Sequence, residues 1–167
     1  MTKAKQQQKE KPKIDEIVSI ILKDKNLENA LDLIAFIEQN KIKLKWSSTN
    51  CWQLYYKGKR IGIIRMAEKA YHMYAIGDNS WLFSPWDSYD IVDMLSDEKS
   101  KKVIWNNVRM CSSCGSCKPG FEKVVFGKKF ENSCHSWLNM INPDKETVEC
   151  IKQMIFIKKK YLDSSVS

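Results

Sequence analysis

A chain of 167 residues, of which 43% are hydrophobic and 29% charged, has the length and composition of one globular domain, which excludes a wholly disordered or fibrous protein. Its formal charge of +8 is concentrated at the ends: residues 1–13 carry +4, residues 158–167 carry +2, and residues 14–157 carry only +2. The sequence has no apolar run long enough to span a bilayer and no signal-peptide core, so we expect a cytoplasmic protein with reduced thiols.

The two ends are predicted to be disordered. Residues 1–13 form a basic tail, because blocks of like charge are often disordered, and 163–167 form a second short tail. A nucleic-acid-binding arm is the alternative interpretation of the first tail. The remaining residues, 14–162, are predicted to fold as one α+β domain.

Two short helices are predicted to begin the domain. Apolar residues at 14, 17, 18, 21 and 22 share one helical face, and the pattern repeats from Asn26 to Asn40. Two helices so close in sequence favour a helical hairpin.

A run of short β-strands follows, predicted from aromatic and β-branched residues at 42–46, 51–57, 60–66, 71–76 and 81–83. Turns are predicted at 57–59 and 77–80, where glycine separates neighbouring strands. Connections this short cannot contain crossover helices, so we expect an antiparallel β-meander.

The last third is predicted to be mixed. Helices are expected at 88–95 and 97–108, the second with Asp97 and Glu98 at its start, where carboxylates complement the helix dipole. A strand at 123–126 with a turn at Gly127 follows. The last helix is expected to open at Asn142-Pro143-Asp144, with Asn142 as its N-cap, and to bury Val148, Ile151 and Ile155.

Four cysteines share one short loop, predicted at 109–135: Cys111, Cys114, Cys117 and Cys134. Their spacing is C-x2-C-x2-C-x16-C, in which two-residue spacers let successive thiolates reach one ion. Four thiolates complete the tetrahedral shell that zinc prefers and leave no position open for water or substrate. We therefore predict a structural zinc site. His135 is an alternative fourth ligand, but Cys134 is favoured because thiolate is the stronger donor, with His135 beside the ligands.

Two other interpretations of the cluster remain. An iron–sulfur site is the first, because C-x2-C-x2-C also occurs in cluster loops. Zinc is favoured, because cluster loops commonly place the fourth cysteine three residues on, whereas here it lies beyond a predicted hairpin. Unrelated surface thiols are disfavoured, because exposed reduced cysteines are reactive. Outside the cluster, Cys51 and Cys150 are predicted to be buried apolar residues and His72 a sheet residue.

Large rings are concentrated in the predicted sheet: Trp46, Trp52, Tyr55, Tyr56, Tyr71, Tyr74, Trp81, Phe83 and Trp86. The favoured interpretation is that they form the core, since strands favour aromatics without any ligand. The alternatives are an aromatic cleft for a small molecule and a stacking platform for single-stranded nucleic acid.

The segment CSSCGSCKPG at 111–120, the motif FGKKF at 126–130 with Cys134, and Asn142-Pro143-Asp144 together resemble an uncharacterised family from low-GC Gram-positive bacteria. Its members pair a tryptophan-rich N-terminal half with a C-x2-C-x2-C-x-P-G loop and a downstream F-G-K-x-F and cysteine. The resemblance covers residues 40–160. It implies that the four cysteines act together as ligands, and it implies no particular activity.

Three functions are compatible with these features. The first is a non-enzymatic module, rigidified by zinc, that binds a small molecule or a protein at the aromatic sheet. The second is an iron–sulfur or thiol redox protein. The third is a nucleic-acid binder that uses the basic tails and Lys118, Lys123, Lys128 and Lys129 of the metal loop. The sequence contains no phosphate-binding loop, dinucleotide fingerprint or catalytic motif, so nothing supports an enzyme.

Overall fold

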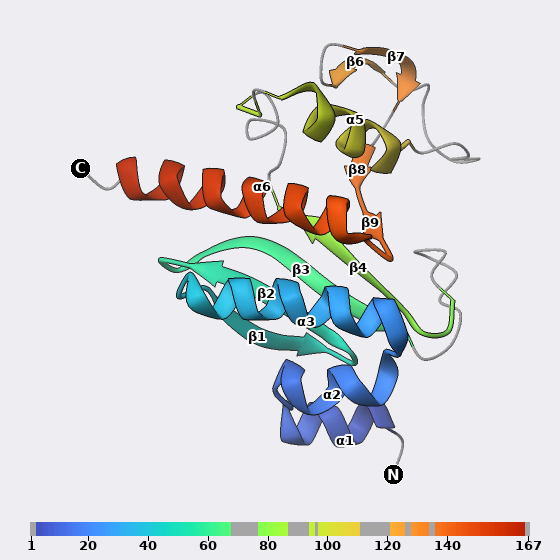
Figure 1. The fold of residues 1–167 in the computed structure, drawn as a ribbon, viewed down its shortest axis with the longest axis vertical. Helices are drawn as coiled ribbons and strands as arrows, with labels where there is room; N and C mark the ends of the chain where they lie inside the picture. Colours follow the sequence, from blue (N-terminus) through green and yellow to red (C-terminus); the bar gives the residue numbers. More distant parts are fainter. Residues whose placement is uncertain are drawn as a thin grey trace.

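The computed structural model describes residues 3–67, 77–86, 94–95, 97–110, 121–125, 128–133 and 136–165. These residues form an α+β fold with helices at both ends of an antiparallel sheet, which confirms the predicted class (Figure 1). The helices are α1 (Lys3–Glu10), α2 (Ile14–Ile21), α3 (Asp24–Gln39), α5 (Glu98–Asn107) and α6 (Lys145–Ser164). The strands are β1 (Lys43–Ser48), β2 (Cys51–Tyr56), β3 (Lys59–Ala67), β4 (Ser80–Pro85), β5 (Val108–Met110), β6 (Phe121–Val125), β7 (Lys128–Ser133), β8 (Ser136–Leu138) and β9 (Met140–Ile141).

The main sheet has the order β1-β2-β3-β4-β9, and all neighbours are antiparallel. Strands β1 to β4 follow one another as the predicted meander. Lys57 and Gly58 both have positive φ, +46° and +78°, in the tight turn between β2 and β3, which is the geometry that two-residue hairpins favour.

The fifth strand of the sheet differs from the prediction. A strand was expected at 71–76, which lies outside the described residues. Strands β3 and β4 pair directly, from Gly62 opposite Pro85 to Ala67 opposite Ser80, so no strand lies between them. The other neighbour of β4 is β9, which arrives from much later in the chain and which sequence periodicity did not reveal because it has only two residues.

Asn142 secures β9 to β4 and is not the cap of α6. Its backbone N–H donates to the carbonyl of Trp81 (2.8 Å), and its side-chain oxygen accepts from the N–H of Trp81 (3.0 Å). The N-cap of α6 is Asp144, whose Oδ1 accepts from the N–H of Thr147 at 2.8 Å. The predicted cap was therefore wrong by two residues, because the amide of Asn142 had a partner on a distant strand.

One side of the sheet is covered by α2, α3 and α6, and the core lies between these layers. Trp52, Trp81 and Phe83 are fully buried on this side, as the core interpretation of the aromatics predicted. Val148, Ile151 and Ile155 of α6 are buried as expected. Tyr71 and Tyr74 lie outside the described residues.

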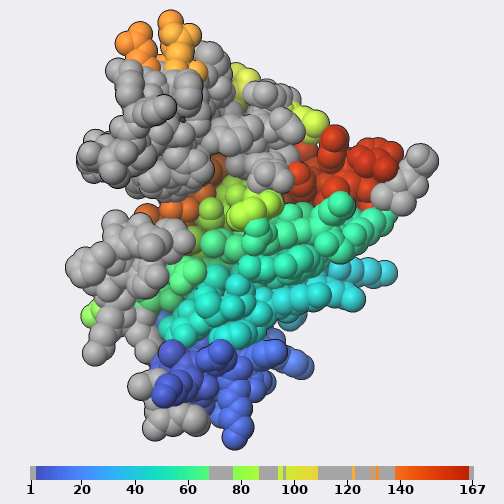
Figure 2. Space-filling model, turned by 180° about the vertical axis from the view of Figure 1, so that it is seen from behind, coloured from blue at the N-terminus to red at the C-terminus, as the bar shows by residue number. Residues whose placement is uncertain are grey.

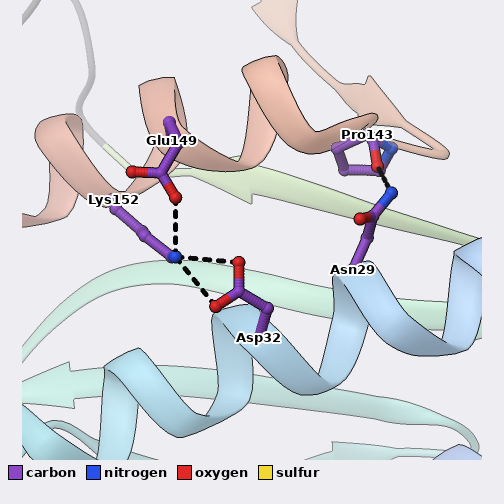
Figure 3. Close-up of polar contacts among 5 residues, drawn as sticks. All are labelled: Asn29, Asp32, Pro143, Glu149 and Lys152. Carbon is purple, nitrogen blue, oxygen red and sulfur yellow. Dashed lines mark hydrogen bonds and ion pairs between the residues drawn. The ribbon is translucent and has the colours of Figure 1, made fainter.

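Polar contacts join α3 to α6 at the margin of this core (Figure 3). The ammonium of Lys152 lies 2.8 Å from Asp32 Oδ2 and 2.7 Å from Glu149 Oε1. The amide of Asn29 donates to the carbonyl of Pro143 at 2.9 Å. The contacts of Lys152 with Asp32 and of Asn29 with Pro143 hold the N-terminal half of α6 against the middle of α3.

Both segments that were predicted to be disordered tails contain helical residues in the part of the chain that the structure describes. Residues 3–10 form α1, and Gln7 is buried, with its Nε2 donating to Asn50 Oδ1 (2.7 Å). At the other end α6 continues through Ser164, and Asp163 accepts from Tyr56 Oη (2.9 Å) and pairs with Lys57 (2.7 Å). Charge density alone predicted disorder, but single side chains with specific partners order both segments.

Helix α5 leads directly into the small ladders next to the cysteine segment. Asp97 is its N-cap and accepts from the N–H of Ser100 at 2.7 Å, while Ile104 is buried in the core. The end of α5 continues without a break into β5. The predicted helix at 88–95 lies almost entirely outside the described residues.

Candidate functional site

The predicted metal ligands Cys111, Cys114, Cys117 and Cys134, and the neighbouring His135, lie outside the described residues. His72 does so as well. The strands that immediately flank these ligands are described, and their pairing is the structural information that bears on this site.

Two antiparallel ladders flank the cysteine segments. Strand β5 pairs with β8, and the last pair of this ladder is Met110 opposite Ser136. Strand β6 pairs with β7, and its last pair is Phe121 opposite Ser133. The strands on either side of the turn predicted at Gly127 are thus paired as β6 and β7, while Phe126 and Gly127 themselves lie outside the described residues. The β5–β8 ladder thus ends at the residue before Cys111, and the β6–β7 ladder begins after Cys117.

The two cysteines within the described part of the chain are buried and are not disulfide-bonded. Burial raises the pKa of the Cys51 thiol, and it raises the pKa of Cys150 to about 11. Both thiols are protonated at neutral pH, so neither is a nucleophile or a ready metal ligand. This confirms their prediction as small buried apolar residues. In the ranges that the structure describes, no three His, Cys, Asp or Glu side chains form a group able to hold a metal.

A pocket of about 370 Å³ lies between α5 and α6. Its wall includes Cys150, whose Sγ lies 3.8 Å from the carbonyl of Ser100, and the Ser100 hydroxyl donates to Gln153 Oε1 at 3.1 Å. The wall also carries Asp97, Lys99, Lys145, Glu146 and Glu149. The Ser100 hydroxyl and the Cys150 thiol of this pocket are therefore both engaged in hydrogen bonds, and the thiol is protonated at neutral pH.

A second pocket, of about 300 Å³, lies at the sheet edge beside the α1–α2 connection and is lined in part by Trp46 and Trp52. It matches the predicted aromatic cleft in having two indole rings in its lining. Both indole N–H groups already have partners: Trp52 donates to the carbonyl of Pro12 (3.0 Å) and Trp46 to Gln7 Oε1 (3.4 Å). These donors hold the N-terminal segment in place and are not free to orient a ligand.

The side of the sheet that faces away from α3 and α6 carries a feature that the sequence analysis missed. Lys43 and Lys45 alternate with Leu44 and Trp46 along β1, and the lysines are exposed while their apolar neighbours are half-buried. The alternation of lysine with apolar residues was the sequence signal that could have revealed this feature, since residues two apart in a strand lie on the same face.

A comparison with protein-family models, curated proteins and solved structures gives no match for this chain. The resemblance drawn from the cysteine motif therefore stays a prediction. None of the helices in the described ranges is both long enough and apolar enough to cross a membrane.

Proposed function

We propose that this protein is a non-enzymatic binding module whose cysteine loop is fixed by structural zinc bound to Cys111, Cys114, Cys117 and Cys134. The observation that carries the proposal is the register of the two small ladders. Met110 is paired with Ser136, and Phe121 is paired with Ser133, so both ends of the three-cysteine segment lie beside a residue that is at most two positions from Cys134.

Chain length supports the same arrangement. Ser133 and Ser136 are three peptide links apart, which span at most about 11 Å. The two ends of segment 111–120 lie beside these two serines, whereas a fully extended chain of its ten residues would span about three times that distance. Ends this close together favour an arrangement in which separate thiolates reach one ion, as a tetrahedral site requires.

The chemistry of the donor set supports zinc and a structural role. Four thiolates match the soft, tetrahedral preference of zinc and leave no open ligand position for catalysis. The ladders themselves are short, with three pairs in β5–β8, so they gain little stability from backbone pairing alone. Structural zinc contributes on the order of 10 kcal/mol in small peptides, which is enough to hold such short strands together.

Metal analysis of the anaerobically purified protein tests the proposal. We expect one zinc per chain and no visible absorbance. Cys117→Ser should lose the metal and lower the melting temperature, whereas Cys51→Ser, the control at a cysteine buried in the sheet, should retain it. Stoichiometric iron with inorganic sulfide and a brown colour would assign an iron–sulfur cluster instead. Equal zinc in wild type and Cys117→Ser would show that the ligand assignment is wrong.

A further inference from the structure

On the side of the sheet that faces away from α3 and α6, outward-pointing side chains of Lys43 and Lys45 on β1, Tyr55 on β2 and Arg60 on β3, together with Trp86, form a surface that we call the open face. Farther along the same side, Ala67 and Leu82 are buried. Figure 2 views the molecule from behind and shows β2 and β3 at the surface in the middle of this side. The register places Lys43 opposite Tyr55 and Tyr55 opposite Arg60, so these three side chains form one row across three strands. Trp86 extends the row, because its N–H donates to the carbonyl of Ile61 on β3 at 3.0 Å.

Within the described residues, the open face has positive charge without compensating acid. Strands β1 to β4 contain no aspartate or glutamate. Among the described residues Lys43, Lys45 and Arg60 form no ion pair with a carboxylate. Some lysines elsewhere in the described fold do pair with a carboxylate, such as Lys152 with Asp32 and Lys101 with Glu98. A flat surface of uncompensated cations attracts polyanions.

Two aromatic rings alternate with these cations. The Lys45 ammonium lies 4.9 Å from the centroid of the Tyr55 ring, and the Arg60 guanidinium lies 3.1 Å from the centroid of Trp86. Trp86 is 44% exposed. Two strand spacings separate Tyr55 from Trp86, which is about 10 Å.

The rings are held in place. Tyr55 Oη donates to Gln53 Oε1 at 2.6 Å, and Gln53 Nε2 donates to the hydroxyl of Ser47 at 3.0 Å. Trp86 is fixed by its backbone bond to Ile61 and by Arg60 on its ring. Preorganised rings lose little entropy when a flat ligand stacks on them.

We propose that the open face binds single-stranded nucleic acid, with bases stacked near Tyr55 and Trp86 and phosphates beside Lys43, Lys45 and Arg60. Exposed rings interleaved with cations are what sequence-tolerant single-strand binding uses. A flat sheet face has no helix or ribbon to enter a duplex groove, so unpaired bases fit it better than paired ones. The inference names the partner of the binding module proposed above and depends on none of the cysteines.

Fluorescence anisotropy with a labelled mixed-sequence 12-mer tests it, with RNA, DNA and the matching duplex measured at several salt concentrations. We expect the single strands to bind more tightly than the duplex. Trp86→Ala should weaken binding about tenfold, as loss of one stacked base does. Tyr55→Leu, which keeps apolar bulk, should weaken it similarly. The relative affinity for RNA and DNA identifies the natural strand.

The C-terminal helix supplies matched controls. Phe156 is 45% exposed, close to the 44% of Trp86, and the Lys160 ammonium lies 4.4 Å from its ring centroid, so this pair is a match for Trp86 and Arg60. Phe156→Ala and Lys160→Ala should leave binding unchanged. The double variant Lys43→Ala/Lys45→Ala should lower the slope of log affinity against log salt by about 1.4, or 0.7 for each lost phosphate contact.

Circular dichroism and metal content are measured on every variant. Folded Trp86→Ala that keeps its metal but loses binding supports the inference independently of the zinc assignment, and a metal-free wild type would reject that assignment alone. Equal affinity for duplex and single strand would overturn the inference. Equal losses in Trp86→Ala and Phe156→Ala, or binding of polyglutamate as tight as that of RNA, would overturn it too, since each would show that stacking on this face does not contribute.

Discussion

Gln7 is predicted to anchor the N-terminal helix, and its replacement gives a direct measure of that role. Helix α1 has almost no apolar side chain with which to pack, since its sequence is KAKQQQKE. Gln7 instead donates to Asn50 Oδ1 (2.7 Å) and accepts from the Asn50 backbone N–H (2.9 Å). Asn50 is itself buried in the β1–β2 turn, where its carbonyl accepts from Met66 of β3 at 2.9 Å.

Gln7→Ala removes both hydrogen bonds between Gln7 and Asn50, together with the longer one from Trp46 Nε1, and leaves the buried Asn50 N–H and Oδ1 unpaired. Each unpaired buried group costs about 1–3 kcal/mol. Because both bonds end on one residue and can relax together, we expect a total loss of about 2–4 kcal/mol. In a chain of this size, this loss corresponds to a fall of about 5–12 °C in melting temperature.

Urea unfolding followed by tryptophan fluorescence and circular dichroism measures this loss. The neighbouring glutamines, Gln6 and Gln8, are both exposed, so they provide matched controls within one turn of the same helix. Gln6→Ala and Gln8→Ala should change stability by less than about 0.5 kcal/mol. If all three variants unfold at the same urea concentration, the N-terminal segment is not anchored by Gln7, and the reasoning from its burial is refuted.

Two further predictions concern the cap of α6 and the centre of the sheet. The Thr147 N–H holds the pKa of the Asp144 carboxyl below its ordinary value, so this cap stabilises the fold fully above about pH 4 and less as the pH falls through the lowered pKa. Asp144→Ala should therefore cost about 1 kcal/mol in urea melts at pH 7 and less at pH 2.5, and an equal cost at both would contradict it. Gly62→Ala would place a Cβ 3.0 Å from the fully buried Phe83 ring and 3.2 Å from the Ser84 carbonyl, so it should destabilise by about 1–3 kcal/mol in the same assay. A neutral result would mean that the ring has room to move.

Local sequence patterns predicted those helices and strands in which apolar residues repeat with the period of the buried face. The helices α2 and α3, the meander β1 to β4 and the hairpin at Lys57 and Gly58 were recovered, because side-chain periodicity and turn chemistry are properties of neighbouring residues. The buried states of Cys51 and Cys150 were recovered for the same reason. The metal ligands stay a prediction from spacing, now supported by the strands on either side of them.

The amino-acid sequence by itself determined the α+β class, the meander and the four-cysteine spacing, since each follows from short-range chemistry. Only the tertiary structure decided that β9 pairs with β4, that Gln7 orders the N-terminus and that Asn142 joins two strands. Each of these contacts links residues far apart in the chain. A single polar residue forms no repeating sequence pattern, so the sequence does not indicate which distant residue it contacts. The open face was decided in the same way, because the cations of β1 and β3 meet Tyr55 and Trp86 only through the register of the sheet.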